Sequence, residues 1–70
     1  MSRYAVVIEQ ADGNLCAYVP DLPGCVATGA DETEVRSHIA EAIALHLESL
    51  RLHGEPVPAP SASAIDIEVA

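Results

Sequence analysis

A loop with two prolines, Pro20-Asp21-Leu22-Pro23-Gly24-Cys25, constrains the fold of this chain more than any other segment. Each proline fixes its own φ, removes a backbone donor and biases the residue before it toward extended geometry. The segment therefore cannot be helical, and we expect a shaped loop that presents Asp21 and Leu22. It is either a recognition surface or a fold-defining corner of a β-meander. In the second case the structural residues are Pro20, Pro23, Gly24 and Cys25.

Three short strands are predicted around this loop. The first covers residues 3–10, and a turn signal at Asp12-Gly13 separates it from a second strand over residues 15–19. A third strand, residues 25–28, ends at Gly29. Because the connections are short, we expect an antiparallel meander.

Both faces of this meander are predicted to be apolar. One face is expected to carry Tyr4, Val6, Ile8, Cys16, Tyr18 and Val26, and the other Ala5, Val7, Leu15, Ala17, Val19, Cys25 and Ala27. An antiparallel sheet with one face in water normally shows polar residues on that face. Since a single helix covers only one face, we expect a homo-oligomer that covers the other.

A helix is predicted from Asp31 to about His53. Asp31 is a good N-cap, and Glu34, three residues later, completes a capping-box pattern. Gly54 is the expected stop. The apolar stripe that should pack on the sheet consists of Val35, Ile39, Ile43, Leu47 and Leu50.

The opposite face of this helix combines glutamates with leucines. Glu41 and Glu48 lie one heptad apart, and Leu45 and Leu52 fall within the same stripe. Two interpretations stay open. The leucines are isolated residues that are either exposed, as is common, or covered by the C-terminal tail. Alternatively, they belong to a partner-binding strip with an apolar centre and a charged rim. The candidate partner-binding residues are therefore Asp21, Leu22, Glu41, Leu45, Glu48 and Leu52.

The C-terminal tail is predicted to be extended. Residues 55–63 contain three alternating prolines. Ile65, Ile67 and Val69 then alternate with acidic residues, which is typical of a half-buried edge strand. The expected architecture is α+β in the order β-β-β-α-β, as one domain over residues 1–70.

The charge of the chain restricts its partners. Three arginines and no lysine stand against eleven acidic residues, for a formal net charge of −8. Direct binding to nucleic acid or to an anionic membrane is therefore disfavoured, whereas a basic protein partner fits. The start of the chain contains no hydrophobic segment of signal-peptide form, so we expect a cytoplasmic protein with reduced Cys16 and Cys25.

No catalytic, metal or cofactor site is predicted. His46 and His53 are two helical turns apart, about 10 Å along the axis, too far to chelate one ion. His38 is placed to pair with Glu34 or Glu41 along the helix. No serine or cysteine sits in a nucleophile triad pattern, and no phosphate-binding glycine loop is present.

Taken together, the first strand, the loop at residues 20–25, the capped helix after Gly29 and the tail at residues 54–60 resemble the HicB-like antitoxin family of type II toxin–antitoxin systems. The resemblance covers nearly the whole chain, and the proline loop is its most specific part. Family members usually begin the helix with Thr, where this chain has Asp31. The resemblance implies a degraded RNase H-like fold without catalytic acids.

The resemblance also implies a function, namely the binding and blocking of HicA toxins, which are small basic RNA-cleaving proteins. Many family members add a C-terminal DNA-binding domain, and we expect this chain to be a short form without one. A second hypothesis stays open: an orphan oligomeric domain with a structural or ligand-binding role and no toxin. A neighbouring gene for a small basic protein would favour the first.

Overall fold

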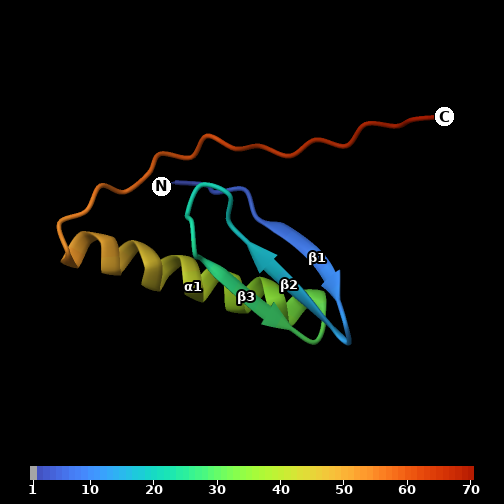
Figure 1. Cartoon of the computed structure of the whole chain (residues 1–70), viewed down its shortest axis with the longest axis horizontal. Coiled ribbons are helices and arrows are strands. Elements are labelled where there is room, and N and C mark those ends of the chain that lie inside the picture. The colour runs from blue at the N-terminus through green and yellow to red at the C-terminus, as the bar shows by residue number, and fades with distance from the viewer. Residues whose placement is uncertain (1) are drawn as a thin grey trace.

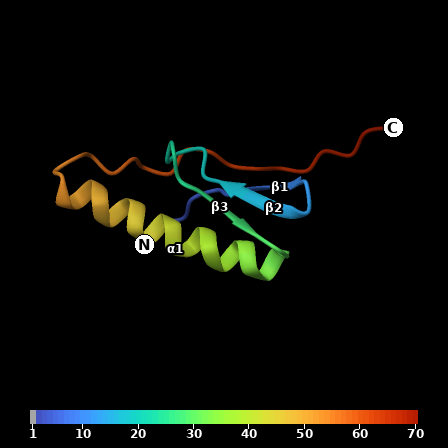
Figure 2. The same cartoon turned by 60° about the horizontal axis from the view of Figure 1, so that its bottom comes forward.

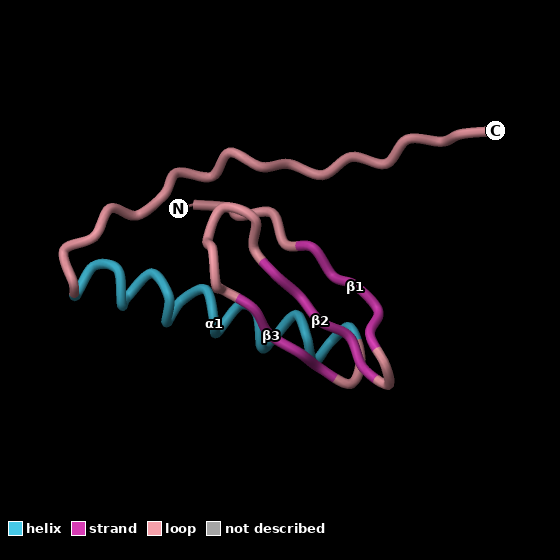
Figure 3. Tube along the Cα trace, viewed as in Figure 1, coloured by secondary structure: helices cyan, strands magenta, loops and turns pink. Residues whose placement is uncertain are grey.

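Residues 2–70 of the computed structural model form a three-stranded antiparallel sheet with one long helix against it (Figure 1). The sheet order is β1-β2-β3, with strands β1 (Val7–Ala11), β2 (Asn14–Tyr18) and β3 (Val26–Gly29). Helix α1 (Glu32–Leu52) follows β3 directly. The predicted α+β meander and helix are confirmed, and Figure 3 shows that the remaining chain is loop.

Strand β1 begins at Val7, four residues later than predicted. Val7 pairs with Tyr18, so Val6 would face Val19. The N–H of Val19 points to the β3 side and donates to the carbonyl of Cys25 at 3.2 Å. Alternation directs the next residue, Pro20, toward β1, and Pro20 has no N–H to donate. The segment before Val7 therefore lacks a strand partner.

The proline loop is a tight corner between β2 and β3. The N–H of Leu22 donates to the carbonyl of Val19, and the N–H of Cys25 donates to that of Leu22, both at 3.0 Å. Gly24 has a φ of 85°, a left-handed conformation that a Cβ atom would penalise. These local bonds close the loop and support its interpretation as a fold-defining corner.

The register of the strands corrects the predicted faces of the sheet. Ile8 lies opposite Ala17, and Ala17 lies opposite Ala27, so the three share one face. The prediction that Tyr4, Val6 and Ile8 share a face with Cys16, Tyr18 and Val26 is wrong. Alternation assigns faces within a strand but leaves the register between strands open. The open face therefore carries Val7, Cys16, Tyr18 and Val26.

The core lies between the other face and α1. It consists of Ala17, Val19, Leu22, Cys25, Val35 and Ile39, with Tyr4 and Val6 packed at its border. Gly29 makes this close packing possible, because a Cβ atom there would lie 2.5 Å from the backbone nitrogen of Val35. The end of β3 thus lies directly against the first turn of α1.

The predicted helix limits are confirmed by their caps. An Asp31 carboxylate oxygen accepts from the N–H of Glu34 at 2.8 Å. The Glu34 carboxylate accepts in turn from the N–H of Ala30 at 3.0 Å. At the other end, Gly54 has a φ of 66°, and the N–H of Glu55 donates to the carbonyl of Leu50 at 2.8 Å.

Only the first half of α1 lies on the sheet, as Figure 2 shows. The predicted apolar stripe is fully buried at Val35 and Ile39, whereas Ile43, Leu47 and Leu50 are half-buried. The second half of α1 extends beyond the sheet because the helix is longer than the strands. A 21-residue helix is about 32 Å long at 1.5 Å per residue, whereas strands of four or five residues reach only about half of that.

The predicted C-terminal edge strand is not formed within the described residues. After Leu52 the chain is extended and unpaired, and Ile65, Ile67 and Val69 are 77%, 73% and 82% exposed. In Figure 1 the tail runs past β1, with β1 between it and α1. The pattern at these positions is that of a strand, but the tail passes β1, an edge strand of the sheet, without pairing with it.

Candidate partner-binding site

The outer face of α1 carries four exposed residues, Glu41, Leu45, Glu48 and Leu52, which we call the acidic leucine strip. Leu45 is 58% exposed and Leu52 is 76% exposed. Residues three or four positions apart on a helix lie side by side, so each leucine borders a glutamate. Helix α1 alone thus brings four of the six predicted binding residues onto one surface.

The C-terminal tail does not cover this strip. It leaves the end of α1 and crosses to the side of β1 (Figures 1 and 2). Among residues 2–70, the one salt bridge joins Arg36 to Glu32 at 3.2 Å, in the first turns of the helix. Glu41 and Glu48 therefore carry uncompensated negative charge beside exposed leucines.

Leu22 does not belong to any exposed surface. Its side chain is 0% exposed and lies in the core. The prediction that the loop presents Leu22 to a partner is wrong, because the corner turns this side chain inward. The two prolines predict a loop of restricted shape, but they do not determine which side chain points inward.

Asp21 holds the C-terminal tail. One carboxylate oxygen accepts from the hydroxyl of Ser61 at 2.7 Å, and the other accepts from the N–H groups of Ser61 and Ala62 at 2.9 and 3.0 Å. We call this set of contacts the Asp21 clamp. Hydrogen bonds from Ala62 and Ser61 hold the pKa of the Asp21 carboxyl below its ordinary value. Asp21 is therefore engaged within the chain.

A second contact holds the start of the tail. The hydroxyl of Tyr4 donates to the carbonyl of Pro58, 54 residues away. Sequence reasoning missed both contacts. The one available signal was a Ser-rich segment after the prolines, whose hydroxyl and amide donors suit a loop carboxylate.

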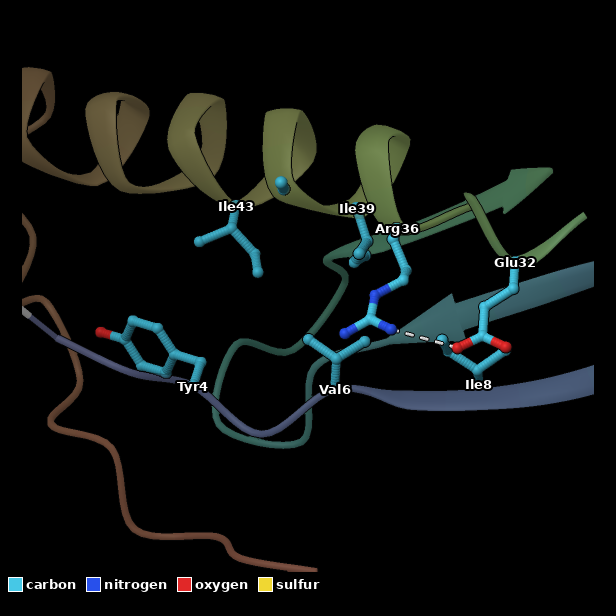
Figure 4. A pocket seen from close by; sticks show the side chains of 8 residues that line it. Tyr4, Val6, Ile8, Glu32, Arg36, Ile39 and Ile43 are labelled. Carbon is cyan, nitrogen blue, oxygen red and sulfur yellow. Dashed lines mark hydrogen bonds and ion pairs between the residues drawn. The ribbon is translucent and has the colours of Figure 1, made fainter. Parts of the chain in front are cut away.

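An apolar groove lies between α1 and the strand β1 with its preceding segment (Figure 4). Its volume is about 460 Å³. Tyr4, Val6 and Ile8 form one wall, and Ile39 and Ile43 form the other. Arg36 reaches from α1 toward Val6 with its guanidinium on Glu32, so one ion pair also lines the groove. The groove exists because α1 covers β2 and β3 and leaves the β1 side of the sheet uncovered.

The histidines and cysteines form no metal cluster in the described part of the chain. Nδ1 of His38 lies 2.7 Å from the carbonyl of Thr28 on β3, rather than pairing with Glu34 or Glu41 as predicted. Cys25 is buried, and burial raises the pKa of its thiol. Cys16 is a free, half-buried cysteine on the open face.

The model of the HicB-like antitoxin family of bacterial toxin–antitoxin systems matches residues 4–69. The chain belongs to the HicB-like antitoxin family. The matched range includes the proline loop, α1 and the tail, so the predicted resemblance is confirmed. An antitoxin-like role follows from this membership.

Three relatives resemble this HicB-like chain. The UPF0150 protein Ta0767 of Thermoplasma acidophilum is 38% identical over 66 residues, which cover 93% of this chain and 96% of the relative. The UPF0150 protein ssr1765 of Synechocystis is 41% identical over 80% of this chain and 72% of the relative. An uncharacterized 14.9 kDa protein of Haemophilus phage HP1 is 33% identical over 79% of this chain and 41% of its own length. No solved structure matches the chain.

Within residues 2–70, no helix is both long enough and apolar enough to span a bilayer. Helix α1 carries glutamates at intervals along its outer face. Its character is that of a surface helix with one side on a sheet.

Proposed function

We propose that this HicB-like chain neutralises a small, basic, RNA-cleaving toxin of the HicA type by protein–protein contact in the cytoplasm. The exposed leucines of the acidic leucine strip support this proposal most directly. An apolar centre bordered by unpaired carboxylates is the composition of a protein-binding surface. Membership of an antitoxin family supplies the kind of partner.

The mechanism follows from charge. A protein that cleaves RNA must bind phosphates with a basic surface. A chain with a net charge of −8 is attracted to that surface, and the glutamates of the strip compete with phosphate for it. Leu45 and Leu52 then exclude water from the contact. Inhibition on this account needs no catalytic residue in the antitoxin.

The test is inhibition of the toxin encoded beside this chain by a Leu45→Glu, Leu52→Glu double variant. We expect a loss of toxin affinity of about 100-fold or more, since two central apolar contacts are replaced by charges. Isothermal titration calorimetry measures the affinity, and an RNA-cleavage assay measures the inhibition.

The matched control is a Val26→Glu, Thr28→Glu double variant. It adds the same charge on alternate residues of β3, on the open face of the sheet, where Val26 is 64% exposed. We expect unchanged inhibition. Equal affinity for the strip variant and the wild-type protein would reject the strip as the contact surface. Failure of the wild-type protein to bind any basic protein of its host would favour the orphan-domain hypothesis.

A further inference from the structure

The groove between β1 and α1 and the C-terminal segment both present apolar side chains that no other part of residues 2–70 covers. The groove is lined by Tyr4, Val6 and Ile8 on one side. The exposed tail residues are Ile65, Ile67 and Val69. Each set repeats at every second residue over five positions. In extended chain both sets therefore span about 13 Å, at 3.3 Å per residue.

We propose that the groove binds the C-terminal segment, residues 64–70, of a second copy of this chain, and that two copies exchange these segments about a two-fold axis. An isologous dimer of this kind contains the same tail-in-groove contact twice. It removes from water three side chains that are more than 70% exposed in the single chain. The proposal concerns self-association and does not depend on the proposed toxin.

Both surfaces carry charged side chains beside the apolar ones, because Arg36 and Glu32 line the groove and Asp66 and Glu68 alternate with the apolar tail residues. With Ile65, Ile67 and Val69 directed into the groove, alternation directs Asp66 and Glu68 to its open side. Arg36 lines the groove and is one of three arginines in a chain without lysine. Its guanidinium already contacts Glu32 at 3.2 Å, and its remaining N–H groups can donate to a second carboxylate.

The occupant is a second copy because the chain's own tail is held elsewhere. The Asp21 clamp fixes Ser61 and Ala62, and Tyr4 binds Pro58. Figure 4 shows the tail leaving past Tyr4 on the far side of β1 from α1. The clamp thus directs the last residues away from their own groove and into solvent, where another molecule can take them.

The test is sedimentation equilibrium of the full chain without any toxin. We expect the wild-type protein to dimerise and the Ile67→Asp variant to bind itself at least about 100-fold more weakly, because a carboxylate would enter an apolar groove. Ile67 makes no core contact, so circular dichroism should be unchanged. The matched control is Ala64→Asp, which adds the same charge on the other side of the segment and should dimerise normally.

Two further variants test the groove itself. Ile8→Asp should also be monomeric, whereas Arg36→Gln should weaken the dimer by only about 2- to 5-fold. An equimolar mixture of Ile8→Asp and Ile67→Asp should form a heterodimer with one intact contact, in which the tail of the first enters the groove of the second. Association that returns when these two variants are mixed is expected only if each copy places its C-terminal segment in the groove of the other.

Three results would overturn the proposal. The first is a wild-type chain that stays monomeric up to about 0.1 mM, since tails would then stay on their own molecules or in water. The second is an Ile67→Asp variant that dimerises as the wild-type protein does. The third is equal loss of association in Ala64→Asp and Ile67→Asp, which would attribute the dimer to net charge rather than to the groove.

Discussion

At the scale of single residues, the proline loop assigns its two central side chains to different tasks. Leu22 completes the core, and Asp21 binds the tail 40 residues further along the chain. The two neighbours thus join the loop to the body of the protein on one side and to the C-terminal segment on the other. Two prolines within four residues indicate a restricted backbone, but the direction of each side chain comes from the tertiary contacts.

The Asp21 clamp should respond to acid. Its hydrogen bonds lower the Asp21 pKa from an ordinary 3.8, so the stabilisation is complete above that value and is lost as the pH falls through the lowered pKa. We expect the amide proton shifts of Ser61 and Ala62 to titrate with a midpoint below 3.8 in nuclear magnetic resonance spectra. In an Asp21→Asn variant this titration should be absent. A midpoint at or above the ordinary value would contradict the clamp.

Leu22 should matter for folding rather than for binding. Removing a fully buried leucine side chain costs about 2–5 kcal/mol, which approaches the whole stability of a domain this small. We expect Leu22→Ala to be largely unfolded in urea titrations under conditions where the wild-type protein is folded. Leu52→Ala, at an exposed position, should change the free energy of unfolding by less than about 0.5 kcal/mol.

At the scale of elements, the caps, the turns and the antiparallel meander were predictable, whereas the register of the strands and the pairing of the tail were not. Asp31 with Glu34, and Gly54, specify both helix ends through bonds among neighbours in sequence. The Asp-Gly turn specifies the first hairpin in the same way. The face to which each β1 side chain points, and whether the tail forms a strand, depend instead on pairing with residues that are distant in the sequence. For the same reason the acidic leucine strip was predictable from helical spacing and the Asp21 clamp was not.

The contact between β3 and α1 depends on Gly29. A Cβ atom at this position would approach the backbone nitrogen of Val35 to 2.5 Å and its Cα to 2.8 Å, and neither atom can turn aside as a side chain could. We expect Gly29→Ala to lower the free energy of unfolding by about 1–3 kcal/mol, the usual cost of overpacking. Thermal denaturation checks this, with Thr28→Ala on the exposed side of the same strand as the control. Equal melting temperatures for the two variants would contradict the close approach.

At the scale of the whole molecule, net charge sets opposite salt dependences for the two proposed contacts. Two copies with a charge of −8 each repel one another, whereas an acidic antitoxin attracts a basic toxin. Raising the salt from about 0.05 M to about 0.5 M screens both effects. We therefore expect the dimer to strengthen and the toxin complex to weaken. Sedimentation measures the first and titration calorimetry the second, and a parallel change in both would contradict this electrostatic account.

The order of the elements has a consequence for how the protein is made. The sheet neighbours are consecutive strands, and α1 follows the strand on which it begins. Chains whose contacts are local in sequence fold quickly. Hairpin, corner and helix can thus assemble in the order in which the ribosome releases them. Only the Asp21 clamp must wait, because Ser61 and Ala62 leave the ribosome about 40 residues after Asp21. The sheet and α1 of a nascent chain are therefore complete before the tail can be bound.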